Sequence, residues 1–91
     1  MKNYFRDDFW DLFQKLPPFA KEQANRAFAH LVLDTRYPSL QFKCVNKQKA
    51  RYSIRINNKK GYRAVGHIVD GDMYWYWIGG DHDEYEREIR K

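Results

Sequence analysis

The hydrophobic period of this sequence changes at Leu40, and that change limits the chain to one class of fold. Before Leu40, apolar residues recur at the spacing of one face of a helix. After Leu40, apolar and polar residues alternate, which is the pattern of strands. Helices followed by consecutive strands predict an α+β domain, in which the helices pack on one face of an antiparallel sheet.

Two helices joined by a proline turn are predicted before Leu40. The apolar face of the first consists of Phe5, Phe9, Leu12, Phe13 and Leu16. This helix ends before Pro17 and Pro18, because the residue before a proline avoids the helical region and proline lacks an N–H donor. The second helix runs from about residue 18 to residue 33, and alanines on its inner face let it approach a sheet closely. The pair forms a helical hairpin.

Four strands are predicted after the helices. They cover Gln41 to Val45, Arg51 to Asn57, Tyr62 to Val69 and Met73 to Ile78. In the second strand, Tyr52, Ile54 and Ile56 share one face, and Arg51, Ser53, Arg55 and Asn57 share the other. A hairpin loop over Asn57 to Gly61 and a tight turn at Asp70 to Asp72 connect the last three strands. We therefore expect a three- to four-stranded antiparallel sheet.

The two ends of the chain are expected to add little regular structure. An opening strand is at most Lys2 to Phe5, so we expect the sheet to lack one edge strand. Residues 81 to 91 form a short charged tail with a last helical turn or two, because acidic residues precede basic ones there. Trp75 and Trp77 are expected in the core, and Cys44 is expected to be a small buried side chain.

The length of 91 residues fits one domain with one core, spanning residues 1 to 91. A single cysteine excludes an internal disulfide and a cysteine-based zinc site, and the three histidines lack metal-ligand spacing. We therefore predict no metal and no other cofactor. No apolar run approaches the roughly 20 residues that span a membrane, and the first residues lack a signal-peptide core. These features favour a cytoplasmic protein without a membrane partner.

Positive charge is concentrated in residues 46 to 70. The basic residues of this segment are Lys47, Lys49, Arg51, Arg55, Lys59, Lys60 and Arg63. Asp70 is its only acidic residue, so the segment carries more positive charge than the whole chain, whose formal net charge is +5. We expect one basic face, and such a face attracts a polyanion: RNA, DNA or an acidic protein segment.

Ordered short matches along nearly the whole chain resemble the RelE/ParE superfamily of toxins. The matching residues are Phe9-Trp10, Leu16-Pro17-Pro18, Tyr37 to Lys43, Tyr52 to Ile56, Gly61 to Val65, Trp75 to Gly79, His82 and Tyr85. The order of two helices followed by three or four antiparallel strands is similar to that superfamily too. No single match is specific, and the resemblance rests on the ordered set.

That resemblance implies a small toxin of a type II toxin–antitoxin module. RelE-like and HigB-like members cut mRNA on the ribosome, without a metal. ParE-like members instead inhibit DNA gyrase and have no comparable nuclease site. Each is neutralised by a cognate antitoxin whose disordered segment wraps the toxin. The expected partners are thus an antitoxin, within a hetero-oligomer, together with the ribosome and mRNA.

Metal-free RNA cleavage needs activation of a 2′-hydroxyl, cations that stabilise the crowded phosphorane, and an acid for the leaving 5′-oxygen. Arg55 and Arg63, on neighbouring predicted strands, could both bind one phosphate. His82 is the candidate acid or base, and Tyr85 could stack on a base or position the phosphate. The candidate RNA-binding residues are Lys43, Lys47, Lys49 and Arg51.

Structural roles compete with these catalytic ones. Arg55 could be a solvated or edge-protecting charge, His82 a polar loop residue, and Tyr85 a side chain that packs the tail. His67 and His30 favour structural roles.

Two departures from the RelE pattern bear on the choice of function. Ser53 stands where such members carry a lysine, with Arg55 able to replace another, and the segment Gly79 to His82 is one residue longer. Three functions therefore stay open: an mRNA endoribonuclease, a ParE-like gyrase-binding toxin, and a catalytically silent RNA- or partner-binding member.

Overall fold

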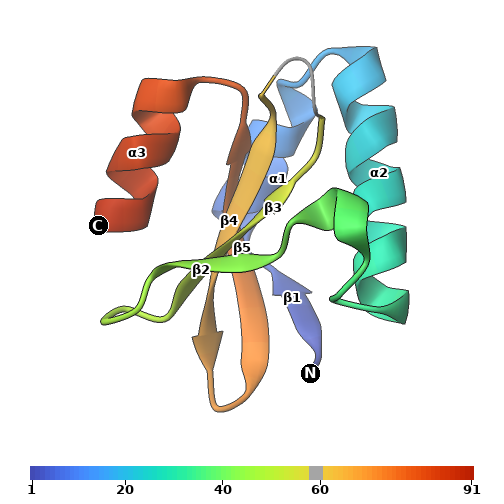
Figure 1. Cartoon of the computed structure of the whole chain (residues 1–91). Helices are drawn as coiled ribbons and strands as arrows, with labels where there is room; N and C mark the ends of the chain where they lie inside the picture. The colour runs from blue at the N-terminus through green and yellow to red at the C-terminus, as the bar shows by residue number, and fades with distance from the viewer. Residues whose placement is uncertain (58–60) are drawn as a thin grey trace.

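The computed structural model describes residues 1–57 and 61–91, which form a five-stranded mixed sheet with helices on both faces (Figure 1). The helices are α1 (Asp7–Gln14), α2 (Pro18–Leu33), the 3-10 turn η1 (Pro38–Leu40) and α3 (His82–Arg90). The strands are β1 (Asn3–Phe5), β2 (Lys43–Asn46), β3 (Arg51–Arg55), β4 (Arg63–Val69) and β5 (Asp72–Gly79). Their order in the sheet is β1-β5-β4-β3-β2. The predicted α+β class and the four predicted strands are confirmed.

The sheet has a fifth strand that the sequence analysis expected to be missing. β1 pairs in parallel with β5, from Asn3 opposite Met73 to Phe5 opposite Trp75. The indole N–H of Trp75 also donates to the side chain of Asn3 over 3.0 Å. β1 has only three residues, so an alternation of apolar and polar side chains cannot be recognised in its sequence. Its pairing is set by contact with β5. The sheet is consequently mixed and not purely antiparallel.

The helical hairpin forms as predicted, with small shifts at its ends. α1 begins at Asp7, because Phe5 belongs to β1, although the ring of Phe5 still packs at 5.1 Å from that of Phe9. α2 begins at Pro18, which fits the first helical turn because that position needs no N–H donor. Three alanines of α2 are buried (Ala20, Ala24 and Ala27), so the helix lies close to the sheet. Most of the core lies between this helix and the sheet.

The C-terminal segment is more structured than predicted. Instead of a charged tail with a turn or two, it forms the nine-residue helix α3, capped by Asp81, whose carboxylate accepts from the N–H of Glu84 over 3.1 Å. Tyr85 and Ile89 lie four residues apart and face the sheet together. They pack on Val65 and Trp77 on the face opposite α2. The helices therefore cover both faces of the sheet, whereas the sequence analysis expected one.

A β-bulge in β5, opposite Val65 and Gly66 of β4, divides the aromatic residues of β5 between the two faces. The register shifts between Val65 and Gly66, where a side chain on residue 66 would collide with the carbonyl oxygen of Tyr74 at 2.8 Å. Trp75 packs on the α2 side, while Tyr76 and Trp77 both belong to the cluster under α3. The expectation that Trp75 and Trp77 are core residues is confirmed.

Among the described residues, the predicted turns have the positive φ angles that tight hairpin turns require. Asp70 and Gly71 both have positive φ, 52° and 82°, as a two-residue hairpin turn requires. Of the predicted hairpin loop Asn57 to Gly61, residues 58–60 lie outside the described residues. Gly61 has φ 74°, and the N–H of Ile56 donates to the carbonyl of Tyr62 over 2.9 Å.

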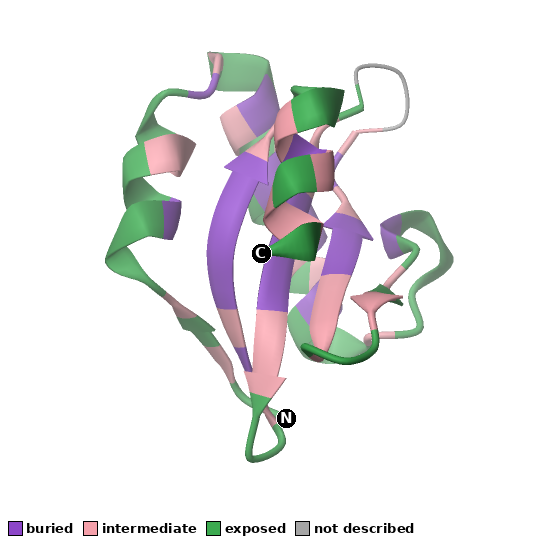
Figure 2. Cartoon of the chain, turned by 90° about the vertical axis from the view of Figure 1, so that its left-hand side faces the viewer, coloured by how far each residue is buried: buried purple, intermediate pink, exposed green. Residues whose placement is uncertain are grey.

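The outer strand β2 differs from its prediction in start and burial. It begins at Lys43, because Gln41 ends η1 in the left-handed conformation with φ 45°. Cys44 is exposed, so the prediction of a buried cysteine is wrong. Among the strands of residues 1–57 and 61–91, β2 is the last of the sheet, with an irregular register after Cys44 and no strand on its outer side. Figure 2 shows the contrast with β5, which is buried over most of its length. Within the described residues, none of the helices combines the length and apolar character needed to cross a membrane.

Candidate functional site

Arg55 and Arg63 lie directly opposite each other on the neighbouring strands β3 and β4. Strand alternation puts them on the same face as Ser53 and Val65, which is the face that α3 covers. Both arginines are half-buried. Two like charges directly opposite in a sheet repel each other, and a bound anion between them would offset that repulsion. The register therefore creates a place where one phosphate could meet two guanidinium groups.

Tyr85 joins this pair from α3, but as a buried residue. Its side chain is only 7% exposed, and its hydroxyl lies 3.2 Å from the hydroxyl of Ser53. The guanidinium carbon of Arg63 lies over the Tyr85 ring at 5.6 Å from the centroid. The Tyr85 ring also packs against Trp77 at 6.0 Å. In this arrangement Tyr85 supports Arg63 and is not open to stack on a base.

His82 stands at the rim of the same site. It is the first residue of α3, and its side chain is 77% exposed. The imidazole Nε2 lies 3.5 Å from the carboxylate of Glu86, one helical turn later. Its ring centroid is 6.3 Å from that of Tyr85. The four residues that the sequence analysis chose as catalytic are thus brought to one end of the sheet, where β5 passes into α3.

The connection between β5 and α3 explains the two glycines before His82. A side chain at residue 79 would collide with the Trp77 ring at 2.8 Å, and one at residue 80 with the Tyr62 ring at 2.7 Å. Glycine is therefore required by close packing at both positions.

Ser53 was missed as a member of the site. It is the one buried polar residue among the described residues, at 2% exposure, and its hydroxyl contacts Tyr85. The sequence did carry a signal, because Ser53 lies between Arg51 and Arg55 on the polar face of its strand. A small hydroxyl side chain between two long cationic ones indicates that another part of the chain packs against the strand at this position. Only the packing of α3 shows what it is.

The four predicted RNA-binding residues all lie on the hairpin formed by β2, the turn after it and β3, but they make different contacts. Lys43 and Lys47 are exposed on β2 and the turn after it. Lys49 instead donates to the carbonyl of Arg90 over 3.3 Å, and Arg51 donates to the carbonyl of Lys91.

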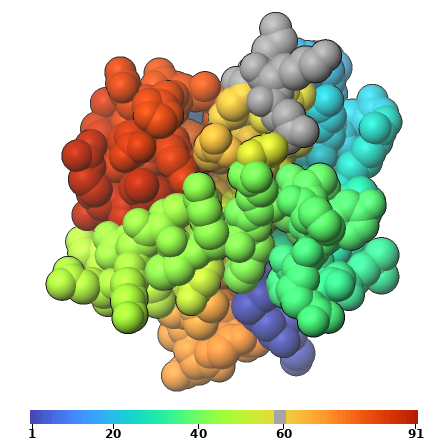
Figure 3. All heavy atoms as spheres, in the orientation of Figure 1, coloured from blue at the N-terminus to red at the C-terminus, as the bar shows by residue number. Residues whose placement is uncertain are grey.

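Together with Asn46, whose amide donates to the carbonyl of Ile89 over 2.8 Å, Lys49 and Arg51 satisfy the last carbonyls of α3. Figure 3 shows this C-terminal segment, in red, against the green β2 region. Two cations at a helix C-terminus also complement the helix dipole. Lys49 and Arg51 therefore hold α3 in place.

The remaining histidines lie away from the arginine pair. His30 stacks on Tyr37 with the rings 4.1 Å apart. His67 is half-buried on β4, and burial lowers its pKa, with the nearby Arg51 and Arg6 lowering that pKa further. Within residues 1–57 and 61–91, no group of three or more histidine, cysteine, aspartate or glutamate side chains could hold a metal ion.

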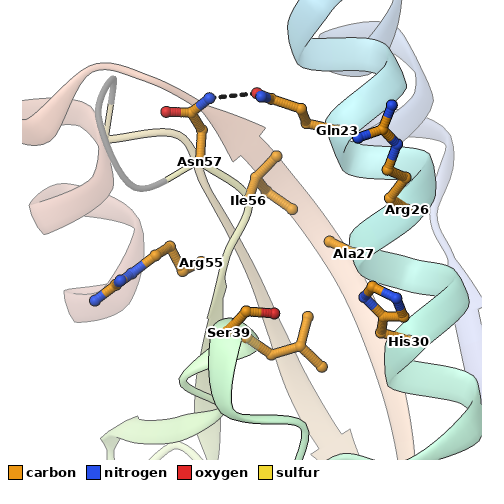
Figure 4. A pocket seen from close by; sticks show the side chains of 9 residues that line it. Gln23, Arg26, Ala27, His30, Ser39, Arg55, Ile56 and Asn57 are labelled. Carbon is orange, nitrogen blue, oxygen red and sulfur yellow. Dashed lines mark hydrogen bonds between the residues drawn. The ribbon is translucent and has the colours of Figure 1, made fainter.

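A cavity of about 430 Å³ lies on the other side of the sheet, between α2 and the end of β3 (Figure 4). Gln23, His30 and Ser39 are among its lining residues, and the amide of Asn57 donates to Gln23 across its rim. In Figure 4 the Arg55 side chain extends away from α2, so its charge is not directed into this cavity. Arg55 is nevertheless among the residues that line the cavity, so the cavity and the arginine pair adjoin at this residue.

Comparisons with known proteins relate the whole chain to RelE toxins by structure. No family model matches the sequence, and no curated protein gives a significant match. The isolated E. coli RelE toxin superimposes with a TM-score of 0.63 over 98% of this chain and 95% of that one, at 16% identity. In the RelB–RelE antitoxin–toxin complex from Methanococcus jannaschii, the matching chain gives a TM-score of 0.71 over 92% of this chain and 96% of that one, at 12% identity.

A third similar structure is an E. coli RelE mutant in complex with a peptide of the antitoxin RelB. It superimposes with a TM-score of 0.63 at 18% identity, covering 99% of this chain and 94% of that one. At these identities the likeness concerns the fold and not the side chains of the site. The resemblance read from the sequence is thus confirmed at the level of architecture: this chain has the fold of the RelE toxins.

Proposed function

We propose that this protein is the toxin of a type II toxin–antitoxin module, and that it cuts mRNA on the ribosome without a metal. The observation that carries the proposal is the register pair of Arg55 and Arg63, with Tyr85 beneath Arg63 and His82 at the rim. The RelE fold and the basic segment 46–70 support the same reading. A cytoplasmic location accords with a ribosomal target.

The cleavage step follows from the charges at this site. The 2′-oxygen of a ribose bonds to the adjacent phosphorus, its proton leaves, and the bond from phosphorus to the 5′-oxygen breaks with protonation of that oxygen. Arg55 and Arg63 stabilise the extra negative charge of the phosphorane, because guanidinium groups stay charged and bind phosphate oxygens in pairs. His82 carries one of the two proton transfers, either donating to the leaving 5′-oxygen or accepting from the 2′-hydroxyl, and water carries the other; its imidazole is exposed, with its ring centroid 6.3 Å from that of Tyr85. Tyr85 acts through Arg63 as a positioning residue.

A cognate antitoxin is the partner that fits the charge distribution. The segment 46–70 is strongly basic; Lys47 within it is exposed, and so is Lys43, which precedes it by three residues. The similar structures include RelE toxins bound to RelB antitoxins. An acidic or amphipathic antitoxin segment would cover this surface and exclude RNA from it, within a toxin–antitoxin hetero-oligomer.

The test is induced expression of the protein with measurement of growth and of mRNA cleavage. Wild type is expected to arrest growth and to cut mRNA only when ribosomes are present. Arg63→Ala should reduce cleavage by at least about 100-fold, because a preorganised charge at the transition state is lost. Arg26→Ala is the matched control, since Arg26 is an exposed arginine of α2 that pairs with Glu22 one turn away.

The outcome of this test also separates the alternatives. Normal growth and intact mRNA, with folded protein present, would favour a catalytically silent member. Ser53 is the observation behind that second candidate, because it places a buried neutral hydroxyl where the RelE pattern has a lysine. Growth arrest with intact mRNA and inhibited gyrase would instead favour a ParE-like toxin.

A further inference from the structure

A row of aromatic rings lies on the α3 face of the sheet, beyond the C-terminal end of α3. We call this row the aromatic ladder, and its members are Tyr4, Tyr74, His67 and Tyr76. Tyr4 and Tyr74 stack with centroids 5.0 Å apart and planes at 17°. His67 lies 6.1 Å from Tyr74 and 5.7 Å from Tyr76. The rings thus follow one another from the edge strand β1 across β5 and β4.

The ladder becomes more accessible toward the edge of the sheet. Tyr76 is buried, and its hydroxyl donates to the carbonyl of Glu88 in α3 over 2.9 Å. His67 and Tyr74 are half-buried, and Tyr4 is 43% exposed. Figure 2 shows that the C-terminal helix lies over the upper part of the sheet and leaves the lower ends of the strands uncovered. An outer ring supported by a second ring is a rigid and accessible stacking surface.

Cations lie at the inner end of the ladder. The guanidinium of Arg51 lies over the Tyr76 ring, 4.9 Å from its centroid, and the Arg51 Nε is buried without a hydrogen-bond partner among the described residues. Arg6 adds a second guanidinium that acts on His67 and Tyr76, with Asp8 as its partner at 3.4 Å. Burial and these two arginines lower the pKa of His67, while the charge of Asp8 acts in the opposite direction.

The ladder shares a face with the arginine pair of the proposed active site. Arg51, Ser53 and Arg55 alternate along β3, opposite His67, Val65 and Arg63 of β4. From Arg55 to Arg51 is four residues, which is about 13 Å along a strand. A strand of RNA held at the arginine pair would therefore have nucleotides within reach of the ladder, around α3.

Flat rings next to guanidinium groups are the usual means of binding single-stranded nucleic acid without sequence preference. Packing accounts for the buried Tyr76 but not for an exposed tyrosine on a three-residue edge strand. We propose that the aromatic ladder is a stacking site for the bases of single-stranded RNA, with Tyr4 as its outer platform and Tyr74 as its support. This inference rests on the proposed function, because it gives the same substrate class a second point of contact.

The experiment measures binding of the full chain to a fluorescent single-stranded RNA of about a dozen nucleotides, by anisotropy over a series of salt concentrations. Every ribose carries a 2′-O-methyl group, so the RNA offers no nucleophile and binding is separated from cleavage. Tyr4→Leu and Tyr74→Leu are each expected to weaken binding by about fivefold or more, because a base loses its stacking partner. The slope of affinity against salt should stay unchanged, because no charge is removed.

Tyr37→Leu is the matched control. Tyr37 is 41% exposed and also stacks on another ring, that of His30 on α2, away from the ladder. Its loss should leave RNA binding unchanged. Tyr4→Trp should retain binding, because it keeps a ring at the same exposed position, and it shows that any loss in Tyr4→Leu concerns stacking and not folding.

Three outcomes would overturn the inference. These are no binding by wild type, equal losses in Tyr4→Leu and Tyr37→Leu, and a loss of antitoxin binding in the ladder variants while RNA binding stays intact. Failure of the proposed function appears separately, as absence of mRNA cleavage by wild type. The ladder inference can fail while Arg63-dependent cleavage persists, and the reverse holds as well.

Discussion

The face of the sheet under α2 and the face under α3 are held by different kinds of contact. Under α2, alanines bring the helix close to a continuous apolar layer that includes Ile54 and Trp75. Under α3, a small apolar cluster is joined by a buried hydroxyl pair, Tyr85 and Ser53, and by the arginine next to it, Arg63. The first face carries the larger apolar cluster, and the second positions Arg63, which is half-buried and could be reached by a substrate.

This difference between an apolar face and a face with buried polar groups has a general physical reason. Apolar burial is favourable wherever it occurs, whereas a buried polar group is acceptable only when its partners are in place. The α3 face therefore depends on a few specific contacts, and losing one of them should change the site more than the fold. The three predictions below test that contrast, beginning with the largest expected effect.

Removing the central ring of the α2 face should have the largest effect on stability. Trp75 is fully buried and packs against Phe28 at 5.2 Å. Trp75→Ala is expected to lower the free energy of unfolding by about 3–5 kcal/mol, because the cavity is too large to collapse. Denaturant unfolding measures this loss.

Trp10→Ala is the matched control for that experiment, since Trp10 is 44% exposed at the surface of α1. It should cost about 1 kcal/mol, as is usual for a partly exposed residue. Similar losses in the two variants would contradict the view that the α2 face carries the stability.

The hydroxyl pair under α3 should contribute less. Tyr85→Phe is expected to cost about 1 kcal/mol, because it leaves the buried hydroxyl of Ser53 without its partner. Adding Ser53→Ala should recover part of that loss, since no polar group is then left buried and unpaired. A double-mutant cycle by denaturant unfolding measures the coupling, and strict additivity would show that the two hydroxyls do not stabilise each other.

The smallest expected effect is the pH dependence that comes from His67. Burial, followed by the charges of Arg51 and Arg6, lowers its pKa in the folded protein below the ordinary value of 6.5, while Asp8 opposes the shift. The unfolded chain therefore binds the proton more readily, so this contribution to stability is complete above about pH 6.5 and is lost as the pH falls toward the folded pKa. His67→Phe should flatten unfolding free energy against pH in this window, and an unchanged curve would contradict the assignment.

Much of the site could be predicted from particular residues, but the roles of those residues could not. Alternation in 51–57 put Arg55 on the outer face, and the glycine before Tyr62 put Arg63 on the next strand, so their proximity was foreseeable. The burial of Tyr85 was not, because it depends on α3 folding back over β3 and β4. The sequence predicts Lys49 as an RNA-binding residue, and only the position of the α3 C-terminus shows that its ammonium also donates to the carbonyl of Arg90.

By itself the sequence determined the order and type of the elements, because hydrophobic period, proline and glycine act over a few residues. It determined α2 from Pro18, the turn at Asp70 and Gly71, and the change to strands after Leu40. Tertiary structure decided the parallel pairing of β1 with β5 and the division of the aromatic residues between two faces. It also decided that α3 packs on the face of the sheet that carries Arg55 and Arg63. Those features rest on contacts between residues far apart in the chain, which no local pattern specifies.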